Sequence, residues 1–179
     1  MLEFLAWLTQ ARSDYSAAGR EFQWALQQRP PVLCHAVAKY QQALEKFIKA
    51  IMSALREAGV GGVHSAGYDH HVQNHLRILR RIPGGGVGRS IQKHLRDFLD
   101  RDTMRGISTL ENLAPRRPAP GLPHERNTEY PYNAPGGGWT CPAVPDSFSL
   151  VEVQEFEKLL RRIAYYANNI AATLHHLPS

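Results

Sequence analysis

Apolar side chains recur every three or four residues along three long stretches of the chain, which is the spacing of an amphipathic helix. The first stretch, residues 2–28, carries Leu5, Leu8, Ala11, Tyr15, Ala18, Phe22 and Ala25. The second follows Pro31 and carries Leu33, Val37, Tyr40, Leu44, Phe47, Ile48, Ile51 and Leu55. The third follows Phe148 and carries Phe156, Leu159, Leu160, Ile163, Ala167, Ile170, Leu174 and Leu177. These patterns predict three long helices.

The ends of the first two predicted helices carry recognisable signals. Pro30 and Pro31 stop the first helix and can open the second, since proline lacks only a donor that the first turn leaves unused. A connection this short makes the two helices antiparallel neighbours. Gly59 can take the left-handed conformation that ends the second helix.

The last predicted helix has the clearest beginning. Ser149 and Glu152 have the spacing of a capping box, in which each side chain bonds the backbone N–H of the other residue. Phe148 and Val153 have the spacing of the hydrophobic staple that accompanies such a box. A helix is therefore predicted to begin at this point.

Shorter helical segments lie between the long ones. Asp69 is a candidate N-cap for a helix that carries Val72, Leu76 and Leu79 and ends near Pro83. The glycine-rich residues 84–88 read as a flexible joint, since neither a preceding strand nor a following Gly-Lys-Ser or Gly-Lys-Thr makes them a phosphate loop. A further helical segment carries Ile91, Leu95, Phe98 and Leu99 and runs to about residue 102.

Residues 113–147 hold eight of the twelve prolines and are predicted to be a long loop without regular structure. No stretch of the chain shows sustained period-two alternation. The sequence therefore predicts an all-α fold, a four- or five-helix up-and-down bundle with this loop before the last helix. With 179 residues, of which 43% are hydrophobic, one domain over residues 1–179 is expected.

Positive charge is concentrated in the middle of the chain. Residues 61–110 carry four of the five net positive charges. The basic residues of this segment are Arg77, Arg80, Arg81, Arg89, Lys93, Arg96, Arg101 and Arg105. Such a field favours phosphate-bearing partners, although a solvated helix face would have the same composition.

Several classes of protein are not favoured by the sequence. The chain has only two cysteines, Cys34 and Cys141, and they are too far apart for a disulfide framework or a cysteine-pair zinc site. This cysteine usage fits a protein of a reducing compartment. No apolar run approaches the 18 or so residues that span a bilayer. Glu3 stands where a signal peptide would carry basic residues. We expect a soluble, cytoplasmic protein without a membrane partner.

One segment resembles a known family. Residues 34–50, CHAVAKYQQALEKFIKA, resemble the second helix of the higher-eukaryote and prokaryote nucleotide-binding (HEPN) domains. Asp14-Tyr15, Asp69-His70-His71 and residues 126–131 support the resemblance in chain order. It implies a helical bundle, often a homodimer, that binds RNA or a nucleotide in toxin–antitoxin or anti-phage systems. The partner it implies is a nucleotidyltransferase-type antitoxin or another defence protein.

Many HEPN domains are metal-independent ribonucleases with an arginine, a polar residue, three or four variable residues and a histidine. Arginine presents a fixed fork to the scissile phosphate, and histidine exchanges protons near neutral pH. Arg126-Asn127 begins such a motif, but Pro131 stands in place of the histidine, as in a non-catalytic branch of the family. A catalytic Arg126 would have to recruit another histidine, such as His124.

A second candidate motif runs from Arg89 to His94 and has the right spacing. If it is catalytic, the protein is an endoribonuclease. If neither motif is catalytic, it is an RNA- or nucleotide-binding protein, or a structural subunit that docks through its last helix and its long loop. Tyr165, Tyr166, Asn168 and Asn169 of the last helix are candidates for a dimer or partner surface.

Four histidines fall within twelve residues, and they have two interpretations besides an ordinary place on the surface or in the core. His71 and His75 would share one helix face, as zinc ligands can, but no nearby cysteine completes a site, so neither a metal nor another cofactor is predicted. Alternatively, a basic segment binds phosphate. Its candidate residues are His70, His71, Arg77, Arg80, Arg81, Lys93 and Asn127.

Two further groups of residues, three aromatic side chains and one charged pair, each have two interpretations. Tyr130, Tyr132 and Trp139 can stack on bases or attach the long loop to the helices. Glu45 and Lys46 match the glutamate–lysine element of the HEPN pattern, and a surface ion pair is the simpler use of these residues.

Overall fold

The computed structural model describes residues 2–64, 71–82, 87–113, 128, 132–133, 139–143 and 147–175. Three long helices are α1 (Glu3–Ala25), α2 (Cys34–Glu57) and α6 (Leu150–His175). Three shorter helices are α3 (Val72–Arg80), α4 (Arg89–Phe98) and α5 (Arg101–Asn112). The predicted all-helical character is confirmed. The two-residue strands β1 (Tyr132–Asn133) and β2 (Trp139–Thr140) pair antiparallel, a ladder too short to leave a period-two pattern in the sequence.

The predicted helix ends agree with the structure at Gly59 and Ser149. Gly59 has a φ of +77°, and its N–H donates to the carbonyl of Arg56 over 2.9 Å. The Ser149 N–H donates to Glu152 Oε2 over 2.8 Å, and the Glu152 N–H donates to Ser149 Oγ over 3.2 Å, so the capping box is confirmed. α2 begins at Cys34 rather than at the prolines.

Two expectations about the shorter helices are wrong. The structure describes six helices, because the segment predicted to end near residue 102 is followed by α5. The cause is Asp100, whose Oδ1 accepts the N–H of Thr103 over 2.8 Å and thereby caps a new helix. α3 has His71 in its N-cap position instead of Asp69, which lies outside the described residues.

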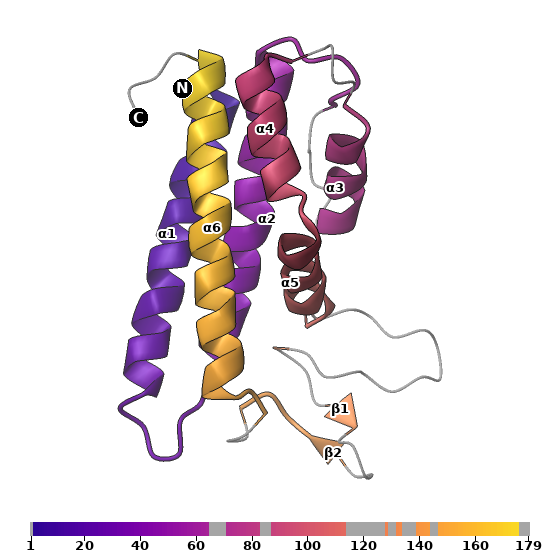
Figure 1. Ribbon diagram of the computed structural model, residues 1–179. Coiled ribbons are helices and arrows are strands. Elements are labelled where there is room, and N and C mark those ends of the chain that lie inside the picture. The colour runs from indigo at the N-terminus through magenta and orange to yellow at the C-terminus, as the bar shows by residue number, and fades with distance from the viewer. Residues whose placement is uncertain are drawn as a thin grey trace.

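The three long helices lie side by side, with α1 antiparallel to α2 and α6 parallel to α2 (Figure 1). Arg56 near the end of α2 bonds Glu3 at the start of α1. The ring of His175 at the end of α6 stacks on Phe4, with centroids 4.2 Å apart. Both contacts join residues that these directions bring to one end of the molecule.

α4 and α5 follow one another along α6 in the opposite direction. Phe98, the last residue of α4, packs against Tyr166 of α6 with ring centroids 6.2 Å apart. Further toward the start of α6, the position of a β-carbon on Gly106 of α5 would lie 3.1 Å from the side chain of Leu159. α3 packs on α2. It lies on the same side of the molecule as α4 (Figure 1).

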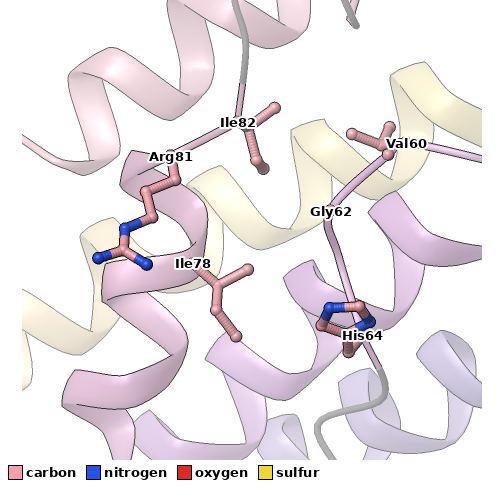
Figure 2. Close-up of a pocket in the computed structure, with 7 residues that line it drawn as sticks. Val60, Gly62, His64, Ile78, Arg81 and Ile82 are labelled. Atoms are coloured by element: carbon pink, nitrogen blue, oxygen red, sulfur yellow. The ribbon is translucent and has the colours of Figure 1, made fainter.

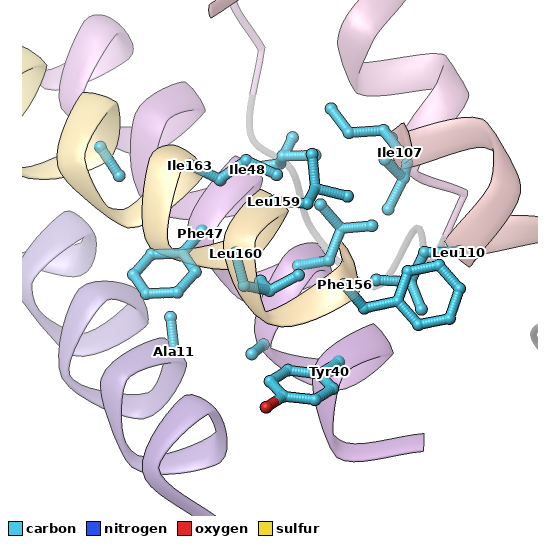
Figure 3. Packing of buried hydrophobic residues seen from close by; sticks show 14 of the residues in the cluster. Ala11, Tyr40, Phe47, Ile48, Ile107, Leu110, Phe156, Leu159, Leu160 and Ile163 are labelled. Carbon is cyan, nitrogen blue, oxygen red and sulfur yellow. The ribbon is translucent and has the colours of Figure 1, made fainter. Parts of the chain in front are cut away.

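The core lies around α2, whose buried residues face α1 and α6 (Figure 3). Fully buried side chains of α2 include Tyr40, Leu44, Phe47, Ile48, Ile51, Met52 and Leu55. Burial of each large apolar side chain contributes roughly 1.5–3 kcal/mol before the cost of ordering it. Leu160 and Ile163 of α6 complete this layer and are also fully buried.

No helix in the described part of the chain combines the length and the apolar character that a membrane crossing requires.

Candidate nucleic-acid interface

The apolar residues of α3 and α4 decide which way their cations point. The buried residues of α3 are Val72, His75, Leu76 and Leu79, and those of α4 are Ile91, Leu95 and Phe98. Once these faces pack on the core, the remaining positions face water. All eight basic residues of the segment 61–110 are exposed.

Three of these cations form a stripe on α4. Arg89, Lys93 and Arg96 are separated by four and three residues, so they share a helix face over about 10 Å of its length. Arg101 and Arg105 extend the exposed positive charge onto α5.

A groove of about 490 Å³ runs between the end of α3 and α4. Its apolar lining residues are Leu79, Ile82, Val87, Leu95 and Leu99. Its charged lining residues are Arg80, Arg89, Lys93 and Arg96, and no carboxylate is among the described residues that line it. Gln92 Nε2 donates to the carbonyl of Val87 over 3.0 Å and fixes the approach to α4. The groove is therefore a pre-formed cationic surface.

The acidic residues near the groove offset little of its charge. Arg96 Nε lies 3.6 Å from Asp97 of its own helix, an exposed pair of little energetic weight. Asp100 is bonded to Arg162 of α6 instead. Burial alone would raise the pKa of Asp100, but the Thr103 N–H and the Arg162 guanidinium lower this pKa more, so it lies below its usual range. Asp100 thus stays ionised and its nearest cation is not a groove residue.

The structure brings together only some of the residues predicted to bind phosphate. Arg80 and Lys93 line the groove with Arg89. Arg81 instead lines a second hollow of about 490 Å³, whose other lining residues include His64, Ile78 and Ile82 (Figure 2). Arg77 is exposed and donates to Asn74 Oδ1 over 3.2 Å.

The two histidines considered as a zinc pair have different environments. His75 is buried, whereas His71 is exposed. Among the described residues, no group of three or more His, Cys, Asp or Glu side chains could hold a metal ion. His70, His124, Arg126, Asn127 and Pro131 lie outside the described residues.

Arg89 and His94, the second predicted catalytic motif, lie on different sides of α4. They are five residues apart on α4, which places them about 140° apart around the helix axis. Arg89 is exposed at the groove, and His94 is half-buried beside the apolar face.

A third hollow, of about 880 Å³, lies between the end of α1 and the start of α2 and is not among the sites predicted from the sequence. Its lining residues are Arg20, Glu21, Trp24, His35, Ala38, Lys39, Gln42 and Thr128. Helical spacing places Arg20 with Trp24, and His35 with Lys39 and Gln42. That signal was present, but only the packing of α1 on α2 shows that the two groups face one hollow.

Thr128 is attached to the helices by two hydrogen bonds. Its Oγ1 donates to Gln41 Oε1 over 3.1 Å, and its N–H donates to the carbonyl of Leu113 over 3.1 Å. Gln41 Nε2 in turn donates to the carbonyl of Leu110 over 2.8 Å. These bonds fix one wall of the third hollow.

The remaining candidates have structural contacts. Glu45 and Lys46 each pair with another residue: Glu45 Oε1 lies 2.7 Å from Lys49 Nζ, and Lys46 pairs with Asp14.

Of the four residues of α6 predicted to form a dimer or partner surface, only Tyr165 is exposed, and the other three are half-buried. Tyr166 packs on Phe98, and Asn168 accepts a bond from Arg12 over 2.6 Å. Asn169 donates to the carbonyl of Tyr165 over 2.9 Å. Tyr166, Asn168 and Asn169 therefore already have contacts within the chain.

Comparison of the chain with protein-family models, with curated proteins and with solved structures gave no match. The resemblance of residues 34–50 to HEPN domains stays a prediction.

Proposed function

We propose that the protein binds RNA by its phosphate backbone along the cationic face of α3 and α4. The observation that carries this proposal is the groove in which Arg80, Arg89, Lys93 and Arg96 meet without a lining carboxylate. Four cations around an apolar floor attract a polyanion and have no acidic residue of the lining to neutralise them.

The chemistry of the groove favours phosphate contacts over base reading. Guanidinium and ammonium groups bind phosphate oxygens, and such contacts position a nucleic acid without reading its sequence. No aromatic side chain is among the described residues that line this groove. The expected binding is therefore salt-dependent and weakly selective for sequence. It requires no cofactor.

The biological setting rests on the resemblance of residues 34–50 to HEPN domains. We propose a HEPN-like protein, built as an up-and-down bundle and paired as a homodimer, that works with a partner such as a nucleotidyltransferase-type antitoxin in a toxin–antitoxin or anti-phage system. The α4–α5 pair, which runs against α6, supports the bundle topology.

A second candidate function is a metal-independent endoribonuclease. The position of Arg89 at the groove favours it. Because His94 faces away from Arg89, cleavage would need a histidine of the second protomer. Incubation of the protein with end-labelled single-stranded RNA in excess chelator tests this. Cleavage that is lost in both Arg89→Ala and His94→Ala would support the nuclease.

The binding proposal is tested with a labelled single-stranded RNA, whose affinity is measured by fluorescence anisotropy over a series of salt concentrations. The Arg89→Ala, Lys93→Ala double variant removes two groove cations. A plot of log affinity against log salt has a negative slope, and its magnitude should decrease by about 1.4 in this variant, since each single-strand phosphate contact contributes about 0.7.

The matched control is the Lys158→Ala, Arg161→Ala double variant, which removes two exposed cations of α6 that lie outside the groove. It changes the net charge equally and should keep the wild-type salt slope. Wild-type protein that fails to bind RNA at low salt, or equal losses in the two double variants, would contradict the proposed groove.

A further inference from the structure

The third hollow differs from the cationic groove because it combines cations with an exposed aromatic ring. Trp24 is 51% exposed and lines the hollow. By contrast, Trp7 is half-buried, and its Nε1 donates to Glu3 Oε1 over 3.1 Å. A large aromatic surface left in water inside a hollow is available for a flat ligand, and nucleobases stack on indole rings without regard to sequence.

The two helices supply opposite walls. Arg20 and Trp24 are one turn apart on α1, and His35, Lys39 and Gln42 share a face of α2. Because α1 and α2 are antiparallel and connected by a short loop at this end (Figure 1), these two groups face each other. The side chain of Ala38 is small and leaves the space between the walls open.

The charges of the lining favour an anion. Two cations, Arg20 and Lys39, stand against one acidic residue, Glu21, and His35 adds a ring nitrogen that can hydrogen-bond a ligand. Lys39 Nζ donates to Gln42 Oε1 over 2.9 Å, which holds the ammonium group at the wall. The hollow, about 880 Å³, is within the size range of small-molecule sites, roughly 300–1,000 Å³.

We propose that this hollow binds one unpaired nucleotide, with the base stacked on Trp24 and the phosphate against Arg20 and Lys39. The nucleotide can be free or part of a strand. The strand form rests on the proposed function, because it adds base stacking to a protein that holds the phosphate backbone at α3 and α4.

Tryptophan fluorescence tests the site directly. Titration with adenosine monophosphate and with a ten-residue oligoadenylate should quench the emission of the wild-type protein, and Trp24→Phe should abolish most of this quenching. Quenching by the monophosphate as well as the oligomer assigns the site to free nucleotides, and quenching by the oligomer alone assigns it to an RNA strand. If neither ligand quenches the wild-type protein, the proposal is wrong.

Affinity for labelled oligoadenylate separates stacking from a general effect of the substitution. Trp24→Ala should weaken binding about tenfold, and Trp24→Phe should keep most of the affinity, since a phenyl ring also stacks. Ala38→Leu should weaken binding because it fills the hollow. Leu26→Ala is the control. Leu26 is an exposed apolar residue that directly follows α1, close to Trp24 in the sequence, and it does not line the hollow.

Wild-type affinity in Trp24→Ala, or an equal loss in Leu26→Ala, would overturn the proposal. The result is separable from the outcome at the cationic groove. A loss in Trp24→Ala without a loss in the Arg89→Ala, Lys93→Ala variant refutes the groove and keeps the stacking site, and the reverse pattern refutes the stacking site alone.

Discussion

At two points of the α1–α2 interface, charged side chains pair across the two helices, whereas the cations of the α3–α4 side face solvent. Asp14 pairs with Lys46, and Glu3 pairs with Arg56, each time between α1 and α2. Arg80, Arg89 and Lys93 are exposed, and none of them pairs with a carboxylate in the described part of the chain. Charges of the first kind hold helices together, while those of the second kind are available to a ligand.

Lys49 is the extreme case on the paired side. Its side chain is 1% exposed, its Nζ lies 2.7 Å from Glu45 Oε1, and the same Nζ lies 4.8 Å from the ring centroid of Trp7. A buried ammonium group is tolerated only with such partners, because transfer of a charge out of water is costly. The comparison between the two sides can therefore be tested by removal of charges.

The largest effect is expected for Glu45→Ala. This change leaves the buried ammonium group of Lys49 without its carboxylate, and the free energy of unfolding should fall by about 3 kcal/mol. Lys49→Met removes the charge but keeps the volume, and its loss should stay below about 1.5 kcal/mol. Urea denaturation measures both. Equal losses in the two variants would mean that an unpaired ammonium group at position 49 costs no more than its removal, and would contradict this explanation.

An intermediate effect is expected at Asp100, which lies between α4 and α5 and pairs with Arg162 of α6. The pKa of Asp100 lies below its ordinary value of 3.8, so the ionised form contributes stability that is present above that value and is lost as pH falls toward the lowered pKa. Asp100→Asn keeps an N-cap but removes the charge. At neutral pH it should cost less than about 1 kcal/mol.

Acid titration isolates this contribution of Asp100. Between about pH 5 and about pH 3, the unfolding free energy of Asp100→Asn should fall less than that of the wild-type protein. Parallel pH dependences would show that the Arg162 pair adds no stability.

The smallest effect on stability is expected in the groove. The Arg89→Ala, Lys93→Ala variant should keep its free energy of unfolding within about 0.5 kcal/mol, because both side chains are exposed and alanine is a good helix former. Thermal unfolding checks this. A larger loss of unfolding free energy would mean that these cations stabilise the fold, as the paired charges between α1 and α2 do. The variant could then not serve as a probe of RNA binding.

Local signals in the sequence were sufficient for the long helices. The apolar period of α1, α2 and α6 predicts each of them, and the capping box at Ser149 predicts where α6 begins. These signals lie within a few residues of each other, so no distant contact is needed to interpret them.

α5 was missed although its own signal is also local. Thr103, Ile107 and Leu110 have helical spacing and are buried, and Asp100 precedes them as a cap. Gly106 and the charged residues between them hide the pattern. A glycine at position 106 allows α5 to pack closely on Leu159, and this contact joins residues far apart in the sequence.

For the candidate sites, composition determined that positive charge lies in residues 61–110, and periodicity determined that it lies on helices whose apolar faces are buried. Only the tertiary structure decided which residues line the same hollow: Arg80 with Arg89 and Lys93, the adjacent Arg81 with His64, and Trp24 with Lys39. The physical reason is that periodicity places a side chain on a face of its own helix, whereas a groove needs two faces, and their relative position depends on packing across the whole core.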